Sequence, residues 1–151
     1  MYTGRARFVI TEADAAWLVD TARRKAVDRG LVIATAVVDP TGHLVSFSRM
    51  DGAKAVAELT ARAKAWTAVM LRAPSADYQA KASPGGGAFG LAELFAGRYL
   101  AQGGGVPISV GGEYVGAVGI TGGTAEEDDE IAAETVAEFG GLVARTPPPA
   151  V

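Results

Sequence analysis

The fold is decided in residues 32–49, which read VIATAVVDPTGHLVSFSR. Residues 32–38 are apolar on both faces of an extended chain, which predicts a central strand covered on both sides. The run at 39–42 has Asp first, Pro second and Gly last, as a type I turn prefers. In residues 44–49 valine and phenylalanine alternate with serine, as in a half-covered strand. The stretch therefore predicts a hairpin whose first strand is central.

Helices are predicted on both sides of this hairpin. The first begins at Thr11, where the spacing of Thr11 and Asp14 is typical of a helix cap, and it ends near Gly30. A long helix follows over about residues 54–71, and its larger apolar residues form one stripe at helical spacing. A short helix is expected at 75–82.

A second hairpin and a last helix complete the pattern. Residues 106–110 and 113–121 are separated by two glycines, which is a strong turn signal. The last helix begins at Thr124 and is expected to stop at Gly140-Gly141. Residues 84–104 give no clear element.

The order of these elements predicts the fold class. Two hairpins with intervening helices indicate an α/β (α+β) protein with a mainly antiparallel sheet covered by helices. A length of 151 residues fits a single domain, and we assign it to residues 1–145. The remainder, 146–151, is predicted to be a mobile Pro-rich tail.

Composition excludes several functional classes. The formal net charge is −3 and the basic residues are scattered, which argues against a nucleic-acid partner. There is no cysteine and only one histidine, so we expect no metal site built from these residues in one chain. No apolar run is long enough to span a bilayer, so we expect no membrane partner. We expect a cytoplasmic protein because the N-terminus has no signal-peptide core, although a secreted form stripped of its signal would look the same.

Four stretches, taken in order and spacing, resemble the GlcG/HbpS family, which also occurs as the C-terminal domain of PduO-type corrinoid adenosyltransferases. They are residues 37–53, 63–68, 104–108, and 115–123 with 128–130. The resemblance implies a profilin-like or PAS-like fold that assembles into dimers or larger rings, up to octamers. It also implies that some members bind haem, while fold alone does not establish chemistry.

The sharpest candidate site is the run Arg49-Met50-Asp51-Gly52. Arg49 and Asp51 could anchor a ligand at a strand end, because arginine holds carboxylates with two hydrogen bonds. The structural alternative is that Asp51 caps the following helix and Arg49 faces solvent or an interface.

Two further candidates concern haem. The resemblance implies an oxygen ligand from a threonine in haem-binding members, and Thr67 is our candidate, against the alternative that its hydroxyl bonds its own helix. His43 is the one classical haem ligand or general base in the sequence, but a place directly after a tight turn predicts exposure. Met50 and Met70 are expected to pack rather than ligate.

Backbone groups supply the remaining candidates. Gly104, Gly105 and Pro107 could line a pocket with their backbone, against the alternative of a plain loop. The acidic run 126–130 could hold a surface cation, or it could simply stabilise the start of the last helix.

These observations leave more than one function open. The first hypothesis is a protein that binds a small organic ligand, with haem as the leading candidate cofactor. The alternative is a cofactor-independent enzyme, such as a lyase, isomerase or cyclase, in a catabolic or biosynthetic pathway. A third is an assembly or regulatory subunit. We also expect a homo-oligomer, a dimer or larger, because Phe89, Leu94 and neighbouring apolar residues have no place in the predicted elements.

Overall fold

A computed structural model describes residues 8–145. Its elements follow the predicted order, with a projecting arm between the second helix and the third strand. They are α1 (Glu12–Asp28), β1 (Ala34–Val38), β2 (Leu44–Arg49), α2 (Ala57–Leu71), the 3-10 helix η1 (Ser75–Tyr78), α3 (Gln79–Ala82), the 3-10 helix η2 (Leu91–Phe95), β3 (Gly105–Val110), β4 (Glu113–Thr121) and α4 (Ala125–Arg145).

The four strands form one sheet in the order β2-β1-β4-β3. Every neighbouring pair is antiparallel, and β1 lies between β2 and β4. All five residues of β1 are buried, so the predicted central strand is confirmed. The predicted fold class, an α+β domain with an antiparallel sheet covered by helices, is confirmed as well.

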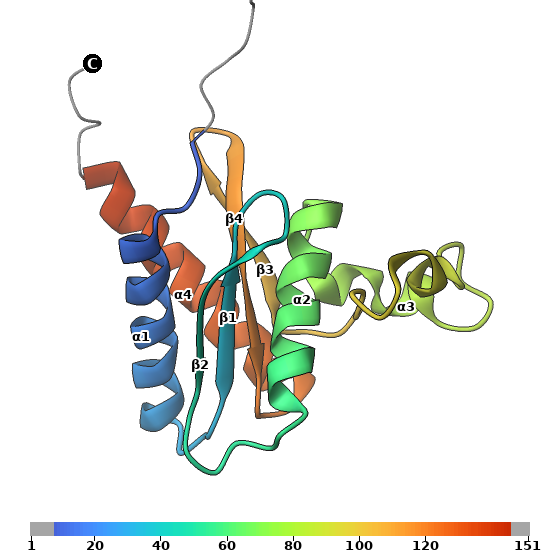
Figure 1. Cartoon of the computed structure of the whole chain (residues 1–151), viewed down its shortest axis with the longest axis horizontal. Coiled ribbons are helices and arrows are strands. Elements are labelled where there is room, and N and C mark those ends of the chain that lie inside the picture. The colour runs from blue at the N-terminus through green and yellow to red at the C-terminus, as the bar shows by residue number, and fades with distance from the viewer. Residues whose placement is uncertain (1–7, 146–151) are drawn as a thin grey trace, which may run out of the picture.

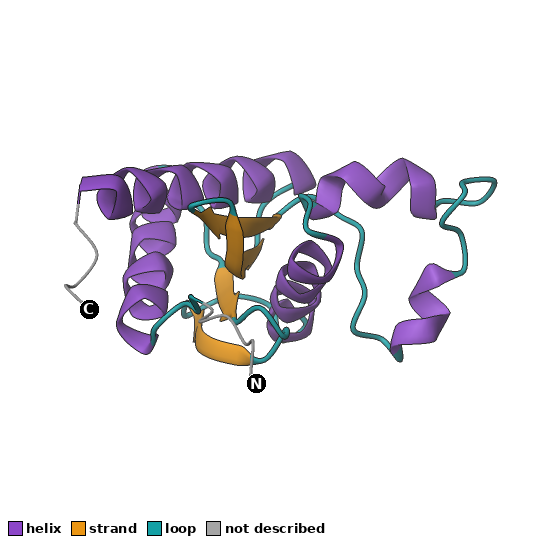
Figure 2. Cartoon of the chain, turned by 90° about the horizontal axis from the view of Figure 1, so that it is seen from above, coloured by secondary structure: helices purple, strands orange, loops and turns teal. Residues whose placement is uncertain are grey.

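Helices cover the two faces of the sheet unequally (Figures 1 and 2). On one face, α1 and α4 pack over a core of large aliphatic side chains that includes Leu18, Val37, Ile120 and Ile131. On the other face α2 lies alone, over a core made almost entirely of alanine. The two sides of the sheet are therefore packed at different distances from their helices.

The close approach of α2 depends on glycine. A Cβ on Gly119 of β4 would lie 2.0 Å from the carbonyl oxygen of Ala61. One on Gly105 of β3 would lie 2.2 Å from the carbonyl oxygen of Lys64. Since real side chains never come this near to a backbone, both positions require glycine if α2 is to keep its place.

The apolar stripe predicted for α2 is not its buried face. Val56, Leu59 and Met70 are exposed, whereas the buried positions include Ala57, Ala61, Ala65 and Ala68. The helix packs through its smallest residues because the glycines below it leave room only for methyl groups. The helix also begins at Ala57, three residues after the predicted start.

The cap predicted for α1 is confirmed. The Thr11 hydroxyl accepts a hydrogen bond from the Asp14 backbone at 3.1 Å, and the Asp14 carboxylate accepts one from the Thr11 backbone at 3.4 Å. Ile10, just before the cap, is buried in the core.

The predicted end of the last helix is wrong, because α4 continues through Gly140-Gly141 to Arg145. Neither glycine has the positive φ of a helix stop. Phe139 is buried and Val143 packs against the same core, so apolar contacts on both sides keep the glycines helical. Glycine weakens a helix by only about 1 kcal/mol, which such packing can offset.

The arm leaves α2 at Arg72, which adopts a left-handed conformation with φ 53°. It contains the short helix predicted for 75–82, seen here as η1 and α3, and it projects beyond α2 (Figure 2).

In residues 8–145 no helix is long and apolar enough to cross a bilayer. The predicted Pro-rich tail, 146–151, lies outside the described residues.

We expect Gly119→Ala to lower the free energy of unfolding by about 1–3 kcal/mol, because the added methyl must push α2 off the sheet. Gly87→Ala is the matched control, since its Cβ would meet no atom within 4 Å and its φ is not positive. Urea unfolding followed by circular dichroism measures both. Equal stability of the two variants would contradict the close contact of α2.

Gly140→Ala should have the opposite effect and raise the free energy of unfolding by about 0.5–1 kcal/mol. Alanine is the better helix former, and the new Cβ would meet no atom within 4 Å. The same urea titration tests it. A loss of stability would mean that Gly140 ends the helix, as the sequence first indicated.

Candidate functional site

The structure does not bring the predicted site residues together. Arg49 ends β2 and Asp51 follows in a turn, and both are exposed. Gly105 and Pro107 lie in β3, at the opposite edge of the sheet. Three strand spacings, about 14 Å, separate β2 from β3, so these residues do not line one pocket.

Thr67 is buried in α2 and uses its hydroxyl twice. The oxygen donates to the Ala63 carbonyl at 2.8 Å and accepts from the Leu100 backbone N–H at 2.8 Å. The first bond is the one expected from the structural alternative. The second fastens the returning arm to α2.

The backbone N–H groups of Gly104 and Gly105 are also used in hydrogen bonds within the protein. The Gly104 N–H donates to the Asp129 carboxylate at 3.1 Å, and the Gly105 N–H donates to the Ser75 hydroxyl at 2.9 Å. Gly104 has φ 120°, and a Cβ there would lie 2.4 Å from the Ile120 carbonyl oxygen. These residues hold α4, the arm and β4 together.

A pocket of about 340 Å³ lies between α2, the β1–β2 turn and residues 97–98 of the arm. We call it the turn pocket. Its apolar walls come from Val38, Leu44, Leu59, Ala63 and Trp66. Thr41, Gly42, His43, Arg62, Gly97 and Arg98 complete the lining. Leu59 and Trp66, two large residues of the α2 stripe, thus form one wall.

The turn below this pocket is held by one carboxylate. The Asp39 Oδ1 accepts hydrogen bonds from the Thr41 N–H at 2.8 Å, the Thr41 hydroxyl at 2.6 Å and the His43 N–H at 3.1 Å. Partial burial acts to raise the pKa of Asp39, but the bonds from Thr41 and His43 outweigh it and the pKa is lowered. A Cβ on Gly42 would lie 2.6 Å from the Trp66 ring, so the turn sits against that ring.

The ionisable side chains that line the turn pocket are two arginines and one histidine. Arg62 is paired with Glu58 at 2.7 Å, with half of its side chain still exposed. Arg98 and His43 are exposed beside it, and the His43 Nδ1 lies 2.7 Å from the Thr41 hydroxyl. The described residues that line the pocket include no carboxylate. The pocket therefore combines apolar walls with a positive rim.

Aromatic contacts tie the arm to the pocket. The Phe95 ring lies 4.9 Å from that of Trp66 and 5.9 Å from that of Tyr99, measured between centroids. Burial, and then the nearby Tyr78, raises the pKa of the Tyr99 hydroxyl. This hydroxyl is buried and has no hydrogen-bond partner in the described part of the chain.

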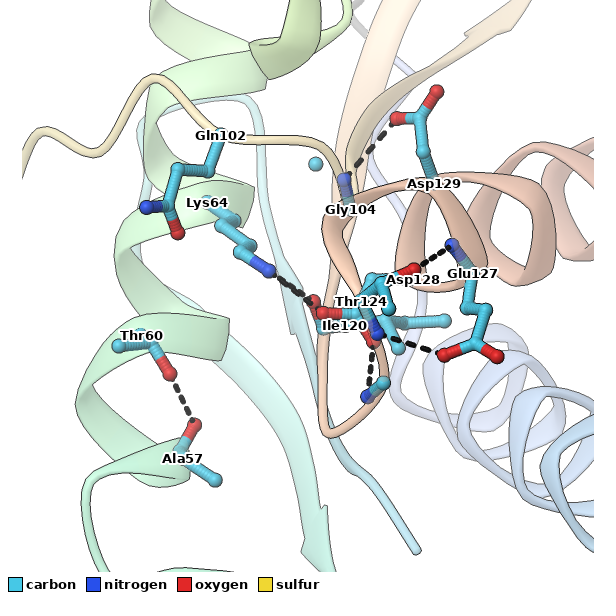
Figure 3. A network of polar contacts seen from close by, with 12 residues as sticks. Ala57, Thr60, Lys64, Gln102, Gly104, Ile120, Thr124, Glu127, Asp128 and Asp129 are labelled. Carbon is cyan, nitrogen blue, oxygen red and sulfur yellow. Dashed lines mark hydrogen bonds and ion pairs between the residues drawn. The ribbon is translucent and has the colours of Figure 1, made fainter. Parts of the chain in front are cut away.

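The acidic run at the start of α4 has structural partners. Glu127 and Thr124 cap the helix reciprocally, at 2.7 and 3.2 Å. Asp128 pairs with Lys64 at 2.9 Å, and Asp129 accepts the Gly104 N–H (Figure 3). No group of three residues suited to hold a metal ion occurs in the ranges that the structure describes.

Arg62, Arg98 and Trp66 line the pocket but were not among the site residues predicted from the sequence. Trp66 lies in a stretch that carried the family resemblance, and His43 was named as a candidate. Nothing in the sequence indicated that the two residues line the same pocket. Arg98 was hidden in the part of the arm for which no element could be predicted. The contact between α2 and the β1–β2 turn is what assembles the pocket.

Comparison with known proteins agrees with this fold. A family model described as haem degrading protein HbpS-like matches residues 10–137. A 15.0 kDa protein from the dhaT-dhaS intergenic region of Citrobacter freundii is 33% identical over 126 residues, covering 83% of this chain and 88% of that one.

Solved structures are similar over nearly the whole chain. The Klebsiella pneumoniae protein ORFY superposes with a TM-score of 0.89 at 29% identity, covering 94% of this chain and 98% of that one. The PduOC:heme complex superposes with a TM-score of 0.81 at 29% identity, covering 85% and 94%. The chain therefore belongs to the HbpS-like family, as the four stretches of its sequence had indicated.

Proposed function

We propose that this protein binds haem, or another flat hydrophobic molecule with acidic groups, in the turn pocket. The observation that carries the proposal is the pairing of apolar walls with the two arginines at the rim, Arg62 and Arg98. A related domain that was solved as a haem complex supports it.

The residues of the pocket fit such a ligand. Leu44, Leu59 and Trp66 offer the apolar surface that a porphyrin needs, and arginines bind carboxylates such as propionates. His43 is the one imidazole of the chain. Because its Nδ1 contacts the Thr41 hydroxyl, Nε2 is left to approach an iron. Bound haem would supply a redox-active iron, and these residues would orient and hold it.

The size of the pocket suggests how the ligand would be covered. Its 340 Å³ lies near the lower end of ligand pockets, which span about 300–1,000 Å³. A porphyrin is larger than this, so the pocket would hold one edge of the ring. The remainder would need a second surface.

We infer that a second copy of the chain supplies that surface. Val56, just before α2, and Leu59 of α2 are 53% and 64% exposed, and Phe89 and Leu94 of the arm are 64% and 77% exposed. Large apolar side chains exposed on two segments are suited to an interface, and symmetric assembly could place the arm of one copy against α2 of another.

Haemin titration followed at the Soret band tests the ligand. We expect saturable binding, about tenfold weaker in Arg98→Ala because a charged hydrogen bond is lost. His43→Ala should shift the position of the Soret band if the imidazole contacts iron. Arg23→Ala, on α1 and paired with Asp20, is the control and should leave the dissociation constant unchanged.

Arg49→Ala and Asp51→Ala separate the turn pocket from the site first expected at the end of β2. Retained affinity in both variants favours the turn pocket. A loss of affinity in these variants but not in Arg98→Ala would move the site to β2. The absence of any saturable Soret change in the wild type would refute haem binding.

Light scattering tests the assembly. We expect a mass of at least two chains of 15.4 kDa each at micromolar concentration. The double variant Phe89→Asp, Leu94→Asp should reduce it, because charges on the exposed apolar arm disfavour burial. Ala92→Asp, an exposed position on the same arm, is the control for added charge. A wild-type mass near 15 kDa would contradict the proposal.

A further inference from the structure

A lysine and an aspartate are buried together where α2 meets α4. The side chains of Lys64 and Asp128 are only 4% and 2% exposed. The Lys64 Nζ donates to the Asp128 Oδ2 at 2.9 Å and to the Ile120 carbonyl oxygen at 3.0 Å (Figure 3). Burying two charges carries a large desolvation cost, and apolar residues often fill such a place with equal or better stability. The pair therefore invites a reason beyond simple packing.

One N–H of the Lys64 ammonium has no acceptor among residues 8–145 once the hydrogen bonds of the pair are assigned. The Asp128 Oδ1 accepts the Gly123 N–H at 2.8 Å, so both of its oxygens are used. An ammonium group carries three hydrogens and accepts none. Two of those on Lys64 have partners, and no described residue accepts the third.

Lys64 also lines a cavity of about 260 Å³. We call it the junction pocket. Its walls come from Thr60 and Lys64 of α2, Thr121 at the end of β4, Gly123, Ala125 and Asp128 at the start of α4, and Gln79 and Gln102 of the arm. No large apolar side chain lines it. The turn pocket, in contrast, lies on the side of α2 that faces the β1–β2 turn.

A second polar group in the same cavity is also unsatisfied. The Thr121 hydroxyl is buried and has no hydrogen-bond partner among residues 8–145. A buried hydroxyl without a partner is destabilising, because it has given up its hydrogen bonds to water. Lys64 and Thr121, each with an unused hydrogen-bonding position, thus line one small polar space together with the exposed residues Gln79 and Gln102.

We propose that the junction pocket is a second ligand site, for a small molecule with a carboxylate or carbonyl oxygen. That oxygen accepts the third hydrogen of the Lys64 ammonium and the hydrogen of the Thr121 hydroxyl. An acceptor is required because an ammonium can only donate. The volume and the polar lining restrict the ligand to a small polar acid. This site is independent of haem binding in the turn pocket.

Isothermal titration of the wild-type protein with pyruvate and with acetate tests the proposal. Methylammonium chloride at the same ionic strength is the control, because it offers no acceptor. We expect saturable binding of pyruvate or acetate and none of methylammonium. Binding should be unchanged in His43→Ala, which affects only the turn pocket.

Thr121→Val is the decisive variant, since it removes the hydroxyl and keeps the shape. It should weaken binding about fivefold to tenfold, and the free protein should be as stable as the wild type or more so because an unpartnered hydroxyl is gone. Thr135→Val is the matched control: this threonine is buried too, but its hydroxyl bonds its own helix at the Ile131 carbonyl. It should leave binding unchanged.

A double variant, Lys64→Met with Asp128→Leu, removes both charges without leaving either one unpaired. It should fold and lose binding altogether. The proposal is overturned if neither acid binds the wild type, or if Thr121→Val binds as tightly as Thr135→Val. A failure of haemin to bind would leave these results unaffected, so the two sites are tested separately.

Discussion

The structure depends on the direct contact between the backbone of α2 and the two glycines below it. Gly119 and Gly105 lie so close to the carbonyl groups of Ala61 and Lys64 that no side chain fits between them. Methyl groups from alanines fill most of the rest of this face. A helix that packs through such small residues is fixed in rotation as well as distance, since any turn about its axis would bring a larger side chain against the sheet.

This fixed rotation decides what α2 presents on its two flanks. One flank carries Leu59, Arg62 and Trp66 toward the β1–β2 turn, where the Asp39 carboxylate holds His43 in place. The other carries Thr60 and Lys64 toward the start of α4. Thr67, buried between the flanks, anchors the arm through the Leu100 backbone. The two pockets are therefore products of the same packing contact, although their chemistry differs.

The two pockets also differ in what binding would require of them. The turn pocket is lined by large apolar groups and exposed arginines, and an oligomer would complete it for a large ring. The junction pocket is small and polar, and its charged pair is held by backbone groups of β4 and α4. The carboxylates at the start of α4 are thus divided between capping the helix, neutralising Lys64 and holding the Gly104 loop.

The sequence by itself determined the central strand, both hairpins, the cap of α1 and the family. These follow from local periodicity, turn residues and motif order, which act over a few neighbouring positions. It did not determine the end of α4, because core contacts of Phe139 and Val143 override two glycines. Nor did it show that Leu59 and Trp66 of α2 line a pocket while Ala61, Ala65 and Ala68 face the sheet. Tertiary structure alone decided that Arg49 and Gly105 lie at opposite edges of the sheet, and that Trp66, Arg98 and His43 meet. The physical reason is that these groupings arise from strand order and helix rotation, and both are set by contacts between residues far apart in the chain.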